Sequence, residues 1–352
     1  MIKALSEIIQ FRNGKKRPIE TGMIPVYGGN GILDYANTAN HENCIIIGRV
    51  GAYCGSVYRE RKACWVSDNA IAAIPMDGND YDFCYYLLQS LKLNSRHIGT
   101  SQPLLTQEIL NRIEADIPAY PIQNRIGSVL SALDDKIAVN ERINDNLAQQ
   151  LQCAYMQKYG SPDQINGTLA DICSYARDRI AVSTISRTDY FSTENMLPNK
   201  QGYIAASSLP TTEYTPKCEP GQILVSNIRP YFKKILLCRE VGGCSADVLC
   251  FAAKHKLGSA YVYSTLYSDR FFDFMVAGSK GTKMPRGDKQ QIMQYPVHVP
   301  TEEELGTFAD LAKPILGLIA SNNKENKALS ELRDGLLPRL MSGEIDVSDI
   351  QI

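Results

Sequence analysis

The stretch DIPAYPIQNRIGSVLSALDDKI, residues 116–137, has a counterpart 182 residues further along the chain. The counterpart, residues 298–319, reads HVPTEEELGTFADLAKPILGLI and matches it without a gap. Pro118 aligns with Pro300, and apolar residues follow each proline at steps of three and four. This spacing is typical of one apolar face of an α-helix. The chain is therefore predicted to contain two copies of a unit that ends in a helix.

Apolar residues occupy the same positions in the two predicted helices. The aligned pairs are Ile126 and Phe308, Val129 and Leu311, Leu133 and Ile315, Ile137 and Ile319, and Leu147 and Leu329. Each predicted helix has ~35–40 residues and a length of ~50–60 Å at ~1.5 Å per residue. Because a lone helix with a single apolar stripe needs a partner, we expect the two helices to pair as a coiled coil.

The segments before the helices also resemble each other. LSEII (5–9) resembles LADIC (169–173), and GTSQP (99–103) resembles GTKMP (281–285). The first pair is 164 residues apart, so the second copy has extra residues in its middle. Short strand-like runs and one helix-like run in each copy predict a mixed α/β domain. The predicted organisation is a first domain at 1–118, a helix at 119–160, a second domain at 161–300, and a second helix with a tail at 301–345.

The composition indicates a globular chain with room for two domains. It has 352 residues, of which 44% are hydrophobic and 21% charged, with a net charge of −1. No window holds about 18 uninterrupted apolar residues, and the N-terminal charges follow the first apolar run, so we expect no membrane span and a cytoplasmic protein. The formal charge is 0 over 1–118 and +5 over 166–300. Local positive charge of this kind favours approach to a phosphate backbone.

Ten cysteines raise the question of a zinc site or a disulfide framework. No CxxC pair occurs, and Cys44, Cys54 and Cys64 are ten residues apart, which is not a zinc-ligand spacing. Cys250 lies inside the apolar run VLCFAA. We therefore interpret the cysteines as buried, reduced thiols and expect no metal site.

Motifs of several enzyme classes are missing from the sequence. There is no Pro-Pro pair of the kind that amino-methyltransferases carry after an acidic or Asn residue, and no GxxxxGK[ST] phosphate loop. YGGNG (27–31) has no long helix after it and is better explained as a turn between strands. We therefore expect no catalytic residue in this chain.

Basic, amide and aromatic residues in the Gly- and Pro-rich loops are candidates for DNA contact. Arg and Asn can form paired hydrogen bonds with guanine and adenine, whereas Lys mostly meets phosphates. In the first copy the candidates are Lys15, Lys16, Arg17, Asn30, Arg49, Tyr53 and Gln102. In the second copy they are Asn227, Arg229, Tyr231, Lys233, Lys280, Lys283 and Arg286. Two alternatives stay open: each charge could be an ordinary solvated side chain, and the Gly-Thr pairs could serve only as turns.

The sequence resembles the specificity subunit of type I restriction–modification systems. The resemblance rests on LSEII and LADIC, on IPVYGGNGI (24–32) and IIIGRVGAYCG (45–55), on residues 116–137, and on LRDGLLPRLMSGEI (332–345). It covers essentially the whole chain. It implies two target-recognition domains of mixed α/β fold, related by a pseudo-twofold repeat and separated by two long antiparallel helices in a coiled coil.

The resemblance also implies a function and a set of partners. Each domain would read one half of a bipartite target in double-stranded DNA, and the helices would dock two DNA methyltransferase subunits, with restriction subunits as further partners. S-adenosylmethionine, ATP and Mg²⁺ would belong to the partner subunits, with no cofactor in this chain. Two other hypotheses remain: a coiled-coil adaptor whose α/β domains bind protein, and a stand-alone DNA enzyme with an unrecognised site.

Overall fold

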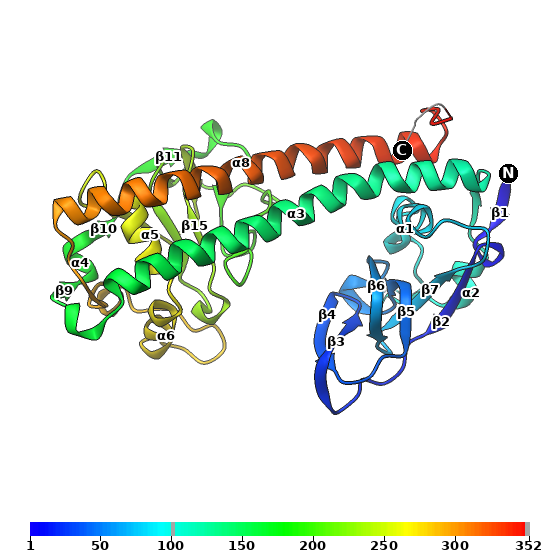
Figure 1. Ribbon diagram of the computed structural model, residues 1–352, viewed down its shortest axis with the longest axis horizontal. Coiled ribbons are helices and arrows are strands. Elements are labelled where there is room, and N and C mark those ends of the chain that lie inside the picture. The colour runs from blue at the N-terminus through cyan, green and yellow to red at the C-terminus, as the bar shows by residue number, and fades with distance from the viewer. Residues whose placement is uncertain (100–102, 349–352) are drawn as a thin grey trace. The chain divides into compact units, whose positions relative to one another are not determined.

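The computed structural model describes residues 1–99 and 103–348 and contains two compact units (Figure 1). Unit 1 comprises Met1–Glu141 and Asn323–Ile352, and unit 2 comprises Arg142–Asn322. Each unit consists of an α/β body together with one half of each long helix, because each half-helix packs on the body beside it. The compact units therefore cut across both helices, whereas the predicted domains end where the helices begin.

Two helices of 40 residues each take part in both units: α3 (Tyr120–Tyr159) and α8 (Glu302–Met341). The helical periodicity of the two aligned stretches thus corresponds to real helices. A capping box precedes α8, in which the Thr301 backbone N–H donates to the Glu304 carboxylate at 2.8 Å and the Glu304 N–H donates to Thr301 Oγ1 at 3.3 Å. These two bonds satisfy backbone donors that the first helical turn would otherwise leave unpaired.

In unit 1 the first half of α3 lies beside the last half of α8 (Figure 1). Arg333 donates a hydrogen bond to Asp134 at 2.6 Å, and Asn140 Nδ2 donates to Glu325 at 2.7 Å. The later position on α3 meets the earlier position on α8. The paired halves therefore run antiparallel.

Unit 2 pairs the other two halves in the same sense. The Tyr159 ring lies 5.8 Å from the Phe308 ring between centroids, and Tyr155 lies 5.9 Å from the same ring. Further along, Asn322 Nδ2 donates to Asn144 Oδ1 at 2.8 Å. The later residue of α3, Tyr159, meets the earlier residue of α8, Phe308, and the earlier Asn144 meets the later Asn322, so these halves also run antiparallel.

Two buried asparagines lie where α3 and α8 meet, one in each unit. Asn140 and Asn322, which align in the repeat, are 1% and 8% exposed. Asn140 donates to Asn326 Oδ1 at 2.8 Å, and Asn322 donates to Asn144, the residue that aligns with Asn326. The same amide pair therefore occurs once in each unit. A polar pair in an apolar seam fixes the register of two helices, because a shifted register would leave the amides unpaired.

The predicted stripe is buried to different degrees. Ile126 and Phe308 are each 3% exposed. The half-buried members are Val129, Leu133, Ile137, Leu147, Ile315, Ile319 and Leu329. Leu311 departs from the prediction because it is 44% exposed. The buried face of α8 instead continues from Phe308 through Ala312 and Leu316, at steps of four, which turns Leu311 toward solvent.

The body of unit 1 is a six-stranded sheet in the order β2-β7-β5-β6-β3-β4, antiparallel except for the β3–β6 pair. Its strands are β2 (Ile9–Asn13), β3 (Thr21–Gly28), β4 (Gly31–Ala36), β5 (His41–Gly48), β6 (Val57–Val66) and β7 (Ala70–Pro75). The other elements are β1 (Ile2–Ala4), α1 (Tyr81–Ser90), α2 (Gln107–Asn111) and β8 (Glu114–Asp116). Buried residues of α1, such as Phe83 and Tyr86, share one core with the sheet, α3 and α8.

The body of unit 2 has two four-stranded sheets, ordered β10-β17-β14-β15 and β11-β13-β16-β12. The strands are β9 (Gly167–Thr168), β10 (Cys173–Tyr175), β11 (Arg179–Ala181), β12 (Tyr190–Phe191), β13 (Tyr214–Cys218), β14 (Ile223–Ser226), β15 (Ile235–Leu237), β16 (Gly242–Cys244), β17 (Val248–Ala253) and β18 (Pro296–Val297). The helices are α4 (Leu169–Ile172), α5 (Ser259–Tyr267), α6 (Asp269–Ala277) and α7 (Lys289–Met293). Strands β11 to β13 lie in the region where the second copy carries its extra residues.

Matching backbone contacts show that the two bodies are copies. The Leu5 N–H donates to the Ile113 carbonyl at 2.8 Å, and the Leu169 N–H donates to the Tyr295 carbonyl at 2.8 Å. These residues have the spacings of 164 and 182 found in the sequence. Strand pair β1–β8 beside the first contact corresponds to pair β9–β18 beside the second. The start of each copy is thus joined to its end in the same way.

Asp134 of α3 joins three elements of unit 1 and provides a stability test. Its carboxylate accepts hydrogen bonds from Tyr86 at 2.5 Å, Arg333 at 2.6 Å and Arg59 at 3.4 Å, and its side chain is 18% exposed. Asp134→Ala would leave two partly buried guanidinium groups without this partner. We expect it to lower the free energy of unfolding by roughly 2–3 kcal/mol in urea denaturation.

The adjacent residue is a matched control for this substitution. Asp135 is 68% exposed and lies 3.9 Å from Arg59. Asp135→Ala should change stability by less than about 0.5 kcal/mol, since exposed ion pairs contribute little. Equal effects of the two substitutions would show that the Asp134 contacts do not hold α1 and α8 to α3.

Candidate nucleic-acid interface

Two loops lie side by side at one edge of unit 2. The β14–β15 loop (227–234) connects two neighbouring strands, and the GT loop (280–286) contains GTKMP. Arg286 forms isolated β-bridges with Ile228 and with Lys280, which joins the loops and closes the second one. The candidate residues of the second copy are all on these two loops, so the fold brings them together.

Unit 1 has the same pair of loops. The β5–β6 loop (49–56) corresponds to the β14–β15 loop with a shift of 178 residues, and the GT loop of unit 1 runs over 98–104 with residues 100–102 outside the described part. Leu104 forms bridges with Val50 and with Ile98, at positions equivalent to those in unit 2. Gln102, a candidate contact, lies outside the described residues.

The glycines of the GT loops have a structural role. Gly99 has a φ of 83° and Gly281 a φ of 98°, a backbone region that side chains with a Cβ rarely adopt. Each GT loop is also tied to its neighbour, because the Gly51 N–H donates to the Pro103 carbonyl at 3.0 Å and the Arg229 N–H to the Pro285 carbonyl at 2.8 Å. The glycine of GTxxP is therefore explained by a turn, while Lys283 and Met284 inside that turn are exposed.

The candidates of unit 2 differ in accessibility. Tyr231 is 48% exposed. Asn227 is only 7% exposed, and its buried Oδ1 has no hydrogen-bond partner among the described residues. This oxygen fits beside Gly287, where a Cβ would be 2.8 Å from it. Asn227 is thus poorly placed to reach a base, contrary to what its loop position suggested. Of Asn227 and Tyr231, only Tyr231 is accessible from solvent.

Carboxylates pair with part of the positive charge in unit 2. Lys280 Nζ lies 2.6 Å from Asp288, and Arg286 lies 3.1 Å from Asp247. The Lys280 hydrogen bond lowers the pKa of Asp288 below its ordinary value, so this carboxylate stays charged. Lys283 has no ion-pair partner among the described residues. The GT loop therefore keeps a net positive charge.

Lys200 is a member of this basic surface that the sequence reading missed. Its Nζ and that of Lys233 each lie 2.9 Å from the Asp269 carboxylate, and both hydrogen bonds lower the pKa of Asp269. The Lys200 N–H also donates to the Lys233 carbonyl at 3.0 Å. Lys200 follows Pro198-Asn199, a turn signal, but only the fold shows that this turn lies beside the β14–β15 loop.

The candidates of unit 1 form two groups. Arg49 and Tyr53 lie on the β5–β6 loop, and a Cβ on Gly29, next to Asn30, would be 3.5 Å from the Tyr53 Cβ. Tyr53 is 56% exposed. Its position corresponds to that of Tyr231, so both copies present an exposed tyrosine at the same place. Because Asn30 follows Gly29 directly, Asn30 also lies close to the β5–β6 loop.

The basic cluster Lys15-Lys16-Arg17 of unit 1 approaches the same region along another path. The Lys15 N–H donates to the Val66 carbonyl at 3.0 Å, before the turn that leads into β7. The Arg49 N–H donates to the Asn69 carbonyl, in the same turn, at 2.9 Å. Lys15 and Arg49 therefore flank one turn. Lys16 is exposed, and Arg17 lies 3.4 Å from Asp34.

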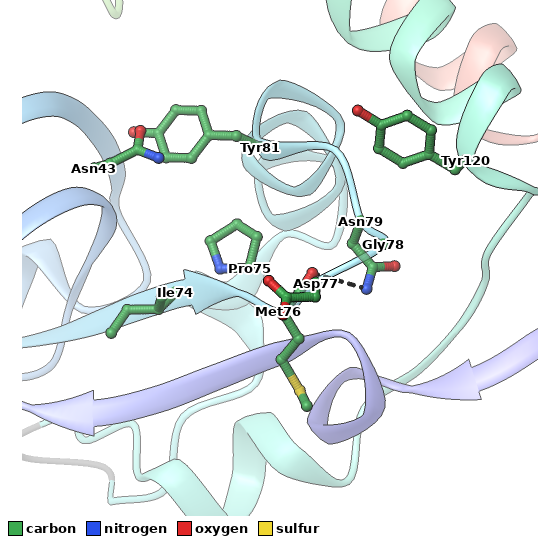
Figure 2. A pocket seen from close by; sticks show the side chains of 9 residues that line it. All are labelled: Asn43, Ile74, Pro75, Met76, Asp77, Gly78, Asn79, Tyr81 and Tyr120. Carbon is green, nitrogen blue, oxygen red and sulfur yellow. Dashed lines mark hydrogen bonds between the residues drawn. The ribbon is translucent and has the colours of Figure 1, made fainter.

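A pocket of about 380 Å³ in unit 1 lies away from these loops. Figure 2 shows it beside the turn from β7 to α1, where Asn79 donates to the Met76 carbonyl at 3.2 Å and Tyr120 of α3 lies at the rim. The pocket is lined by Ile74 and Pro75 at the C-terminal end of β7. The β5–β6 loop lies at the other end of this strand, where Ala70 pairs with Gly48. It contains Asp77 and no basic residue, which makes it unsuitable for a phosphate backbone.

Over residues 1–99 and 103–348, no three His, Cys, Asp or Glu side chains come together in a way that could hold a metal ion. Nine of the ten cysteines are buried, and Cys153 is exposed. No helix in the described part of the chain combines the length and apolar character needed to cross a bilayer.

Comparison with known proteins shows what the chain resembles. Residues 1–149 match the family described as the Type I restriction modification DNA specificity domain. The specificity subunit of the type I restriction enzyme EcoprrI from Escherichia coli is 29% identical over 141 residues, which make up 38% of this chain and 35% of that protein. The MjaIX specificity subunit from Methanocaldococcus jannaschii is 20% identical over 320 residues, or 79% of this chain and 72% of that protein.

A solved structure shares the fold. The type I restriction-modification S subunit from M. genitalium aligns over 99% of this chain and 96% of its own, with 16% identity and a TM-score of 0.54. Residues 1–149 therefore match a type I DNA specificity domain, and the predicted resemblance of the chain to type I specificity subunits is confirmed. The match to EcoprrI spans about a third of that relative's length.

The turn role of Gly281 can be tested by substitution. Gly281→Ala places a Cβ on a residue with a φ of 98°, so we expect a loss of roughly 1–3 kcal/mol in unfolding free energy. Gly306→Ala in α8 is the control, since no atom lies within 4 Å of the added Cβ and alanine favours a helix by up to about 1 kcal/mol. Thermal unfolding of both variants should shift in opposite directions. An unchanged unfolding temperature for Gly281→Ala would show that the turn does not require glycine at this position.

Proposed function

We propose that this chain is the DNA-recognition subunit of a type I restriction–modification complex and that each unit reads one half of a bipartite target. The observation that carries the proposal is the repeated pair of loops. Both copies hold a strand-connecting loop against a GT loop with the same backbone contacts, and the side chains on the two loop pairs differ. A constant support with variable side chains suits two readers of different half-sites.

The proposal includes partners that supply the chemistry. Two methyltransferase subunits, and restriction subunits in a complete complex, would provide S-adenosylmethionine, ATP and Mg²⁺ sites, while this chain is non-catalytic. Exposed apolar residues on the long helices support docking. They are Val139, Ile143, Leu311, Leu318 and Leu332, each between 39% and 50% exposed. A subunit of this kind would act on DNA in the cytoplasm.

The long helices are proposed to act as the spacer between the two readers. Forty residues at ~1.5 Å each give a helix of ~60 Å, and one turn of B-DNA is ~34 Å. An antiparallel coiled coil of this length is long enough to serve two half-sites that do not adjoin. The buried amide pairs at Asn140 and Asn322 would keep the spacing constant by fixing the helix register.

The experiment that tests the function is a map of methylated bases. DNA would be isolated from cells that express this chain with its methyltransferase partner, and sequenced for modified bases. We expect a bipartite motif with a spacer of fixed length. Methylation without a bipartite motif, or DNA binding that is independent of sequence in the assembled complex, would contradict the proposal and favour a protein-binding adaptor. Cleavage or methylation by the purified chain alone would show that it is an enzyme.

The two equivalent tyrosines yield a prediction for DNA binding. Tyr53→Ala and Tyr231→Ala each remove an exposed ring or hydroxyl from one loop pair, so each should weaken binding of the assembled complex by roughly tenfold. Tyr120→Ala is the control, because Tyr120 is 50% exposed but lies by the pocket at the far end of β7. Fluorescence anisotropy with target DNA measures the effect. Equal affinities for all three variants would exclude the tyrosines from the interface.

A further inference from the structure

We propose that Arg229 and Lys233 form a preorganised clamp for DNA phosphates that unit 2 has and unit 1 lacks. The inference rests on the proposed function, and it adds a division of labour between the two units. Unit 2 would supply most of the sequence-independent grip on the DNA. Unit 1 would contribute less to it.

The first observation is the backbone conformation of these two residues. Arg229 has a φ of 49° and Lys233 a φ of 51°, in the left-handed region that residues with a Cβ seldom adopt. The equivalent positions of unit 1 are Gly51 and Gly55, with φ values of 73° and 85°. Both loops therefore follow a similar left-handed path. Unit 1 meets this requirement with glycine, whereas unit 2 places two cations there.

Internal pairing does not explain the two cations. Lys233 contacts Asp269, but Lys200 already lies 2.9 Å from the same carboxylate. Arg229 has no ion-pair partner among the described residues, and its buried Nε has no hydrogen-bond partner there. Backbone strain kept without an internal benefit is a feature of functional sites. The unused positive charge points to an external anion.

The loop is fixed at both ends, which makes it suitable for a clamp. The Arg229 N–H is bonded to Pro285 of the GT loop, and the Lys233 carbonyl accepts from Lys200 on the other side. Pro230 follows Arg229 and begins the short 3-10 helix Pro230–Phe232. Because the loop is already ordered, binding an anion costs little conformational entropy.

Phosphates are the anions that this arrangement fits in a DNA-binding protein. Arginine binds a phosphate through its planar guanidinium, and lysine acts as a point charge that meets phosphates more often than bases. The formal charge of +5 over 166–300, against 0 over 1–118, agrees with a stronger phosphate contact in unit 2. The clamp would thus set affinity and salt dependence more than the choice of bases.

The test replaces each residue by the one that unit 1 carries at the same position. Arg229→Gly and Lys233→Gly remove the charge and relieve the left-handed strain together. In the complex assembled with the methyltransferase, we expect binding to target DNA to weaken about tenfold or more, and the slope of log K against log salt to fall by about 2 for the double variant. The thermal midpoint should stay unchanged or rise by a few degrees.

Two further sets of variants separate charge from backbone effects. Arg229→Gln with Lys233→Gln removes the charge and keeps a side chain, so it should reproduce the loss of binding and of salt slope. Lys256→Ala is the control. Lys256 is exposed and follows the C-terminal end of β17, whereas Asp247 and the β14–β15 loop lie at the N-terminal end of that strand, so DNA binding by this variant should match the wild type. Arg49 is the charged residue on the β5–β6 loop of unit 1, and Arg49→Gln should reduce the salt slope by less than the unit 2 pair does.

The outcomes distinguish this inference from the proposed function. The clamp is contradicted if the wild-type complex binds target DNA and the Gly and Gln double variants have the same affinity and salt slope as the wild type. The proposed function would be unaffected by that result. A midpoint lowered by many degrees in the Gly variants, with normal DNA binding by the Gln variants, would show that the residues only hold the loop. Wild-type complex that does not bind DNA would reject the proposed function itself.

Discussion

The pairing of two long helices, each with a single apolar stripe, is the constraint on which the rest of the structure depends. Neither helix can leave such a stripe in water, and in each unit half of α3 covers half of α8. The α/β body then packs on this pair, through Tyr86 in unit 1 and through Tyr261 in unit 2. The loops of each unit are therefore carried by a rigid support, which is what the proposed DNA-reading role requires.

The duplicated body explains how one chain can present two related but different surfaces. The backbone contacts that tie each strand-connecting loop to its GT loop recur in both copies. Tyr53 and Tyr231 also recur, whereas Gly51 is replaced by Arg229. Under the proposed function, shared positions would hold the loops or make contacts common to any DNA, and divergent positions would be free to differ between the two halves.

The fold was predictable where a regular pattern ran over many residues. The helices, the repeat and the mixed α/β character of the bodies follow from periodicity and from two fixed spacings. The strand order did not follow, because pairing between strands depends on contacts far apart in the sequence. Leu311 shows the limit even within a helix: it fits the stripe by spacing, but Ala312 and Leu316 face the partner and Leu311 is exposed.

The candidate site was predictable in part. Basic residues on Gly- and Pro-rich loops were identified, and the fold brings those of unit 2 together. The burial of Asn227 depends on the space that Gly287 leaves, and the place of Lys200 depends on a turn packed against the β14–β15 loop. Neither contact is local, so neither could be inferred from neighbouring residues.

The sequence by itself determined the duplication and the two long helices, because repeats and helical periodicity are properties of spacing along the chain. Its motifs also gave the resemblance to type I specificity subunits. Only the tertiary structure decided which side chains share a surface and which are buried. It also showed that Arg229 and Lys233 hold left-handed conformations where the other copy has glycine. The backbone path of a loop is set by the strands and loops that it contacts, and those contacts exist only once the chain has folded.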